Sequence, residues 1–403
     1  MKALRFFTKS VFLVSAIAIF AGCSDYVQDP DPSTGGPLFL IACNGNDDGS
    51  LVEGLYTMQI ASPAPKLEFI TEYYPWAKGL NYVDFNNGRI AFNVDNPPEG
   101  QSRVAYMDVS NLKDVKFVPN PSAPEGWVCK MSKGAKPLVF KDGRIAYHVV
   151  FTREVYEDHH EGQLAIYNPK NGSIELSGKL TDFILAQPEN GGDTEDGSMK
   201  AGFALSPDNK YIYCWVYGYG TTWGSYHEDT DYIARYTVGK PFSYERVEQT
   251  SRVDYITGDG KYLIVGGGIH RITLSTSSFD QDISEYDIIA YSGQVSKKSS
   301  KVLRAWGGQG LAIYDFNGAE SIWLYYITRN EDMEKKYNAA GGEYQFSADE
   351  SHVYFTGSTD FWNHKGDMVV YSSLIEENNT KPDSLTFLPS AFNTGGLFLL
   401  ISE

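Results

Sequence analysis

The sequence predicts an all-β protein made of repeated four-stranded units, and three observations support this fold class. Aromatic side chains make up 14% of the 403 residues, and such side chains pack well on pleated strands. The chain has 39 glycines, a number that suits many tight turns. Short segments of alternating polarity recur with turn residues between them, whereas long amphipathic helical patterns are lacking beyond the N-terminus.

The clearest repeat unit covers residues 201–249. Its first strand leads into the turn Ser206-Pro-Asp-Asn-Lys210, in which proline fixes φ and Asp and Asn favour a tight turn. Segments 211–216, 232–237 and 244–248 follow as the second, third and outer fourth strands. This order of strands and turns defines the unit that we sought elsewhere in the chain.

Four further segments repeat a short strand, a polar turn and an alternating strand. Their turns contain Asn-Gly, Asp-Gly or Asp-Glu corners, and the first two of these pairs are strong hairpin signals. The copies cover residues 83–92 with 104–108, 138–147 with 164–168, 254–265, and 344–355 with 368–371.

The two ends of the repeat region complement each other. Segments 38–43, 55–60 and 67–71 resemble the second, third and fourth strands of a unit that lacks its first strand. Segment 397–401 is a strand left over after the last complete unit. We predict that it inserts as the innermost strand of the N-terminal unit, which would remove exposed strand edges. The sequence therefore predicts a single β-propeller of about seven four-stranded blades, with six or eight left open.

The turn at 206–210 and its copy Thr257-Gly-Asp-Gly-Lys261 resemble the corner that begins each blade of TolB-type and WD-type propeller repeats. The resemblance covers nearly all of residues 38–402, although the Trp-Asp pair of true WD repeats is missing. It implies a propeller fold and says little about the ligand.

The N-terminus resembles the signal peptide of bacterial lipoproteins. Lys2, Arg5 and Lys9 precede the apolar segment 11–20, and Phe20-Ala-Gly-Cys23 follows it. This pattern is similar to a lipobox, although that motif usually has Leu where Phe20 stands; an ordinary signal peptide is the alternative. The resemblance implies a signal peptide (1–22) and lipid attachment at Cys23. The polar segment that follows, with its Pro and Gly residues, predicts a flexible tether (23–37), and the repeats place the propeller domain at 38–403. We expect a cell-envelope protein anchored in the membrane by lipid, the outer membrane being favoured over the inner.

Charge and cysteine content limit the partners. The formal net charge of −17 repels nucleic acid and anionic polymers, whereas neutral sugars and cationic groups are compatible with it. Besides Cys23, the chain contains Cys43, Cys129 and Cys214. One disulfide among these three is open and none is required.

Propeller topology places the loops between second and third strands, and the connections between blades, on one face. These loops are rich in residues that stack on sugar rings or orient a ligand. The alternative is that the aromatic side chains cap the propeller core. The candidate ligand-binding residues are Trp76, Trp127, Tyr219, Trp223, Tyr226, His227, Trp306, Phe361, Trp362 and His364.

A weak metal-binding signal lies in the same set of loops. His159, His160 and Glu161 offer imidazole and carboxylate ligands, but their spacing matches no specific motif, so a solvated acidic loop is the alternative. We expect no required cofactor and leave a divalent metal as an option. Nucleophile-elbow, His-Glu-x-x-His and Walker motifs are lacking.

Three functions are compatible with these features. The preferred hypothesis is a non-catalytic propeller that captures a glycan or an iron chelate for an uptake system, with an outer-membrane transporter as a candidate partner. The alternatives are a structural or protein-interaction propeller of an envelope complex, and an envelope polysaccharide hydrolase or lyase. Catalysis is thus left open but not preferred.

Overall fold

The computed structural model shows an all-β chain, with no α-helix in the part that it describes. No helix there is long and apolar enough to cross a membrane. The described residues are 36–61, 64–75, 82–94, 96–99, 101–131, 135–153, 160–178, 203–218, 221–222, 225–226, 230–241, 244–248, 253–265, 270–273, 283–285, 293–306, 310–315, 320–324, 343–358, 367–376, 383–392 and 396–403.

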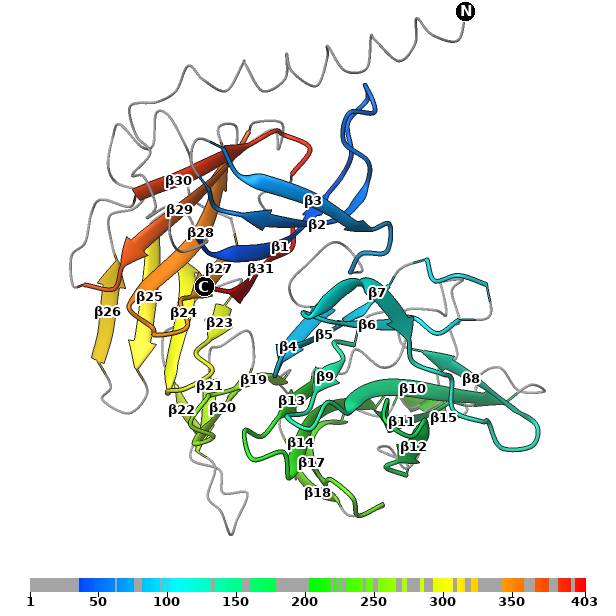
Figure 1. The fold of residues 1–403 in the computed structure, drawn as a ribbon. Coiled ribbons are helices and arrows are strands. Elements are labelled where there is room, and N and C mark those ends of the chain that lie inside the picture. Colours follow the sequence, from blue (N-terminus) through cyan, green and yellow to red (C-terminus); the bar gives the residue numbers. More distant parts are fainter. Residues whose placement is uncertain are drawn as a thin grey trace, which may run out of the picture.

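The first sheet joins the two ends of the chain (Figure 1). Its strands are β1 (Leu38–Cys43), β2 (Gly54–Gln59), β3 (Lys66–Thr71) and β31 (Phe398–Ser402), in the order β3-β2-β1-β31. Strand β31 runs antiparallel to β1, with Phe39 opposite Leu400 and Ile41 opposite Phe398. The pairing that we expected for the leftover C-terminal strand is therefore present.

The second and third sheets follow along the chain. The second has strands β4 (Val83–Asn86), β5 (Arg89–Asn93), β6 (Val104–Asp108) and β7 (Asn111–Phe117), in that order. The third sheet has the order β12-β11-β10-β8, and the short β9 also pairs with β10. Its strands are β8 (Trp127–Met131), β9 (Leu138–Val139), β10 (Ile145–Arg153), β11 (His160–Asn168) and β12 (Ser173–Leu176).

Four more four-stranded sheets and one small hairpin complete the described fold. In each sheet, spatial order equals sequence order. The fourth sheet contains β13 (Phe203–Leu205), β14 (Tyr211–Gly218), β17 (Thr230–Thr237) and β18 (Tyr244–Glu248), and the fifth contains β19 (Val253–Ile256), β20 (Tyr262–Val265), β21 (His270–Thr273) and β22 (Ile283–Glu285). The sixth contains β23 (Gly293–Val295), β24 (Lys301–Trp306), β25 (Gly310–Asp315) and β26 (Glu320–Leu324), and the seventh contains β27 (Tyr344–Phe346), β28 (His352–Ser358), β29 (Met368–Leu374) and β30 (Asp383–Leu388). The hairpin consists of β15 (Thr221–Thr222) and β16 (Ser225–Tyr226).

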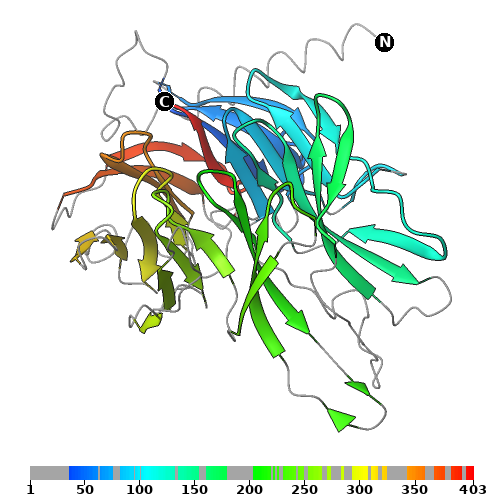
Figure 2. The same ribbon diagram turned by 90° about the horizontal axis from the view of Figure 1, so that it is seen from below.

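The first strands of successive sheets contact one another, so they form the inner side of the arrangement (Figure 2). Strand β9 contacts β4 and β13, β13 contacts β19, and β27 contacts both β23 and β31. Because strands alternate in direction, the turns between first and second strands lie on one side, which we call the hairpin face. The loops between second and third strands lie on the opposite side, which we call the loop face.

Side chains close the repeated turns of the hairpin face. Ser206 Oγ donates a hydrogen bond to Asp208 Oδ1 at 2.7 Å, and the Lys210 backbone N–H donates to the same oxygen at 3.1 Å. The Tyr211 N–H donates to Ser206 Oγ at 2.9 Å. Equivalent bonds occur in the turns at 257–261 and 347–351. The turn motif is repeated because it satisfies its own backbone groups.

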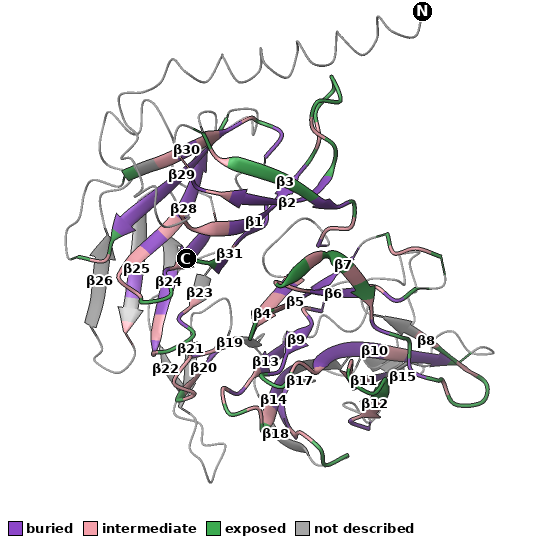
Figure 3. Cartoon of the chain, viewed as in Figure 1, coloured by how far each residue is buried: buried purple, intermediate pink, exposed green. Residues whose placement is uncertain are grey.

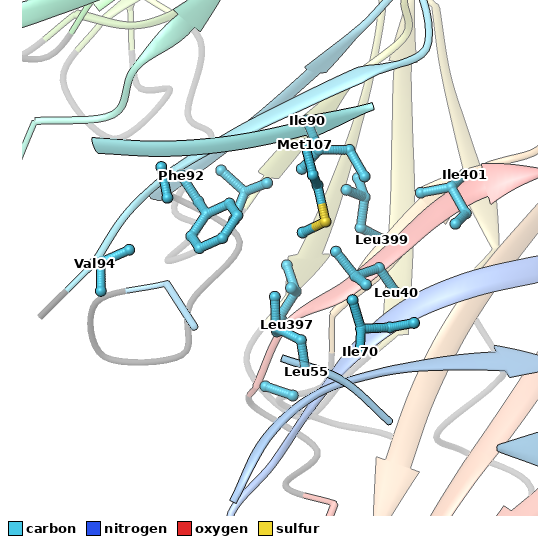
Figure 4. Close-up of a cluster of buried hydrophobic side chains, with 13 residues drawn as sticks. Leu40, Leu55, Ile70, Ile90, Phe92, Val94, Met107, Leu397, Leu399 and Ile401 are labelled. Atoms are coloured by element: carbon cyan, nitrogen blue, oxygen red, sulfur yellow. The ribbon is translucent and has the colours of Figure 1, made fainter. Parts of the chain in front are cut away.

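The hydrophobic core lies mainly between neighbouring sheets (Figure 3). Figure 4 shows the cluster between the first two sheets, where Leu40, Leu397 and Leu399 face Ile90, Phe92 and Met107. These side chains are buried, which fixes the relative position of the sheets that border the loop-face cleft described below. Cys43, Cys129 and Cys214 form no disulfide with one another, so the disulfide left open by the sequence is not formed.

Candidate functional site

A cleft of about 400 Å³ opens between the first two sheets on the loop face. One wall comes from the loop between β1 and β2 and from the residues that follow β3. The other wall comes from the residues that follow β5. The lining residues are Glu53, Glu72, Tyr73, Tyr74, Val94 and Asn96.

Backbone pairing and core packing hold the walls of this cleft. Pro75 forms an isolated antiparallel bridge with Val94, which joins the connection after β3 to the end of β5. The Tyr73 N–H donates to Thr71 Oγ1 at 3.2 Å. The Tyr73 ring meets the Phe117 ring edge-on, with 5.2 Å between centroids, and both tyrosines of the cleft pack against the core cluster of Figure 4. The aromatic wall is therefore built into the fold.

The cleft combines acidic and aromatic groups. Glu53 and Glu72 are exposed, whereas Tyr73 and Tyr74 are half-buried. Partial desolvation, followed by the charge of Glu72 and a hydrogen bond to it, raises the pKa of Tyr73, so the phenol keeps its proton at neutral pH. Such a site can stack an aromatic ring on a sugar, bond to its hydroxyl groups, and use a carboxylate for proton transfer.

A second carboxyl group of interest, Glu343, lies directly before β27, at the loop-face end of an inner strand. Its N–H donates to Thr356 Oγ1 at 3.0 Å, and its carbonyl oxygen accepts from the Thr356 N–H at 3.1 Å. Desolvation raises the pKa of Glu343 to about 7. At neutral pH this carboxyl group is therefore partly protonated. No motif marks it in the sequence, because the desolvation comes from tertiary packing.

The predicted metal ligands are not brought together in the described structure. His159 lies outside the described residues. The expectation that His160 and Glu161 belong to a loop is wrong, since they begin β11 and pair with Thr152 and Phe151 of β10. The reason is that β10 extends to Arg153 and recruits them into the sheet. Within the described ranges, no group of three or more His, Cys, Asp or Glu side chains is placed to hold a metal ion.

Most of the predicted ligand-binding residues fall outside the described structure. Two others are strand residues rather than loop residues: Tyr226 belongs to β16, and Trp306 ends β24 opposite Gly310. The residues outside the described ranges are Trp76, Tyr219, Trp223, His227, Phe361, Trp362 and His364, and the predicted lipidation site Cys23 is outside them as well.

Trp127 was expected in a connection between blades, but it begins β8 and lies opposite Arg153. Its side chain is half-buried and packs against the core between the second and third sheets. The Arg153 guanidinium lies 5.2 Å from the centre of the Trp127 ring. Because this contact covers the ring, Trp127 supports the end of β10 instead of offering an open stacking surface.

No protein-family profile matches this sequence, and no curated protein sequence matches it. Among solved structures, an oligogalacturonate lyase in complex with manganese is 10% identical, with 88% of this chain and 96% of the lyase covered and a TM-score of 0.48. A prolyl endopeptidase is 13% identical, with 92% of this chain and 50% of the endopeptidase covered and a TM-score of 0.45. A puromycin-hydrolyzing peptidase of Mycobacterium tuberculosis is 11% identical, with 89% of this chain and 55% of the peptidase covered and a TM-score of 0.44.

These similarities correct one expectation. The lyase and the prolyl endopeptidase have propeller-type folds, in agreement with the all-β sheets described above. The preference for a protein without catalytic activity is contradicted, since enzymes are among the structures with a similar fold. At such identities and TM-scores, neither the substrate of a neighbour nor the manganese of the lyase can be assigned to this chain.

Proposed function

We propose that this protein is a cell-envelope hydrolase of a neutral polysaccharide, built on a closed seven-bladed propeller, and that the loop-face cleft between the first two sheets binds the sugar chain. The observation that carries the proposal is the joint presence of two tyrosines and two carboxylates in one cleft.

The aromatic wall favours a sugar as the ligand. Tyr73 and Tyr74 present half-buried rings backed by the core, so little side-chain freedom is lost when a sugar ring stacks on them. Asn96 adds an amide that donates and accepts hydrogen bonds, which suits vicinal hydroxyl groups.

Charge favours a neutral sugar over an acidic one. The formal net charge is −17, and both charged residues of the cleft are acidic. A polyuronate such as oligogalacturonate would be repelled at long range and inside the cleft. Elimination, which lyases catalyse, needs a uronate carboxylate to acidify the neighbouring C–H bond. A neutral polysaccharide lacks that group, so hydrolysis is the reaction that fits.

Hydrolysis of a glycosidic bond commonly uses two carboxyl groups. One protonates the departing oxygen, and the other activates water or attacks the sugar carbon. Glu72 suits the second role because the Tyr73 phenol holds its side chain. Glu53, on the same wall of the cleft, is the candidate for the acid. Glu343 is a further proton donor on the same face, because its pKa lies near neutrality.

The closed ring and the anchor are parts of the same proposal. Pairing of β31 with β1 supports closure, and so do hydrogen bonds between neighbouring sheets. Asn87 Nδ2 donates to the Lys141 carbonyl oxygen at 2.7 Å, and the Ala348 N–H donates to Glu403 Oε2 at 3.0 Å. Lipid attachment at Cys23 and residence at the outer membrane rest on the sequence pattern. An anchored hydrolase would act on glycan close to the cell surface.

Reducing-sugar release from neutral polysaccharides tests the activity. We expect turnover of at least one neutral substrate and none of polygalacturonate. Glu53→Gln and Glu72→Gln should each abolish turnover while leaving substrate binding measurable by calorimetry. Tyr74→Ala should weaken that binding. Glu376→Gln, at an exposed glutamate after β29, is the matched control and should behave as wild type.

The proposal fails if the folded wild-type protein turns over none of the neutral polysaccharides. It also fails if the Glu53→Gln, Glu72→Gln double variant retains activity.

A further inference from the structure

A cluster of charged groups lies among the inner strands of three sheets, away from the loop-face cleft. Asp84 and Phe85 belong to β4, Lys136 precedes β9, and Lys297 lies in the turn between β23 and β24. Lys297 Nζ donates to the Phe85 carbonyl oxygen at 2.5 Å and lies 4.4 Å from the centre of the Phe85 ring. Residues 212 positions apart in the sequence therefore meet here.

Positive charge exceeds negative charge among the described groups of this cluster. Lys136 Nζ lies 3.7 Å from Asp84 Oδ1, while Asp84 Oδ2 accepts a hydrogen bond from the Val139 N–H at 2.7 Å. Two ammonium groups thus lie within electrostatic range of one carboxylate, which pairs with Lys136 and also accepts a hydrogen bond from the backbone. Desolvation lowers the pKa of Lys297 to about 8, with Lys136 adding to the effect and Asp84 opposing it.

The turn that carries Lys297 is held in place. Ser296 Oγ accepts from the Lys298 N–H at 2.9 Å and also hydrogen-bonds Glu350 of the seventh sheet. Gly258 permits the neighbouring turn to approach, since a Cβ at that position would lie 2.4 Å from the backbone of Lys297. Lys297 is therefore less free to reorient than a typical surface lysine.

Both lysines remain accessible to solutes. The Lys297 residue keeps exposed surface, although its ammonium group is desolvated beside Phe85, and the Lys136 side chain keeps 37% of its accessible surface. An anion that approaches the pair would gain two charge-assisted hydrogen bonds and would reduce the repulsion between the two ammonium groups.

We propose that Lys136 and Lys297 form a binding site for a small anion that carries a phosphate or carboxylate group. The site shares no residue with the lining of the loop-face cleft and does not depend on the hydrolase proposal. Its anionic ligand differs in charge from the neutral glycan, so the two sites can be tested separately.

Isothermal calorimetry and thermal unfolding with inorganic phosphate, and separately with citrate, test this site against chloride at equal ionic strength. We expect phosphate or citrate to bind wild type and to raise its melting temperature beyond the effect of chloride. The arm that responds identifies the anion class. Lys136→Met or Lys297→Met should weaken binding by about tenfold or more, as expected for the loss of a charge-assisted contact. Lys240→Met, at an exposed lysine after β17, should leave binding unchanged.

Two further measurements keep the proposal falsifiable if Lys297→Met destabilises the fold. Lys297→Arg keeps the charge and should retain binding. Binding by wild type should decline as the pH is raised past about 8, where Lys297 loses its proton. The proposal is overturned if neither anion binds wild type more tightly than chloride does. Unchanged binding in both methionine variants would overturn it equally.

Discussion

Replacing Glu343 by glutamine tests whether this carboxyl group is desolvated by the fold. Glutamine has nearly the same shape but cannot ionise. Desolvation raises the pKa of Glu343 from its ordinary value of 4.5 to about 7. The native state therefore binds more protons than the unfolded state between these two pH values, and the free energy of unfolding of wild type falls as the pH rises through that window. Below pH 4.5 the two proteins should be about equally stable.

The size of the effect follows from the same two values. At about 1.4 kcal/mol per tenfold change in proton affinity, the difference between 4.5 and about 7 corresponds to roughly 3 kcal/mol. Glu343 keeps part of its surface in solvent, and screening there reduces the effect. We therefore expect Glu343→Gln to be more stable than wild type by about 1–3 kcal/mol at pH 8.

Urea unfolding of both proteins at several pH values between 4 and 8 measures this difference, with Glu376→Gln as the exposed control. The stability difference should grow with pH for Glu343→Gln and stay flat for the control. A difference that does not change with pH, or that favours wild type at pH 8, would show that the carboxylate is well solvated or paired, and the argument for a raised pKa would be wrong.

Two further substitutions test the packing of the sheets. Glu350→Ala removes contacts that join the sixth and seventh sheets, namely hydrogen bonds from the Ser296 and Ser299 hydroxyls and an ion pair with Lys301 at 3.7 Å. We expect the free energy of unfolding in urea to fall by about 1–3 kcal/mol. An unchanged unfolding midpoint would contradict this role of Glu350. Phe92→Ala leaves a cavity in the core between the first two sheets, where the Phe92 side chain is fully buried. The free energy of unfolding, measured by thermal unfolding, should fall by about 3–5 kcal/mol. A decrease below about 1 kcal/mol would mean that this core is not tightly packed.

Local sequence patterns were sufficient to predict the repeated strand-turn-strand units and the turns within them. The alternation of side chains sets which residues of a strand can be buried, and the turn at 206–210 closes through bonds between residues at most five positions apart. The pairing of the C-terminal strand with β1 was also predictable, because the first unit lacked a strand and the last segment supplied one. Tyr73 and Tyr74 follow segment 67–71, the predicted fourth strand of the first unit, so their place in a connection on the loop face was predictable from the sequence.

Other features depend on segments that are distant in the sequence. Residues 127–131 form a strand because β10 extends to Arg153 and pairs with them. Trp127, which was expected in a loop, therefore packs against the core. The raised pKa of Glu343 and the cluster around Lys297 have no sequence signature, because desolvation and charge repulsion depend on neighbours in other sheets. The sequence by itself therefore determined the repeated strands and turns, which depend on local patterning, and the pairing of the first and last strands, which follows from the strand missing in the first unit. Only the tertiary structure decided which carboxylates and lysines meet, because those contacts form between sheets.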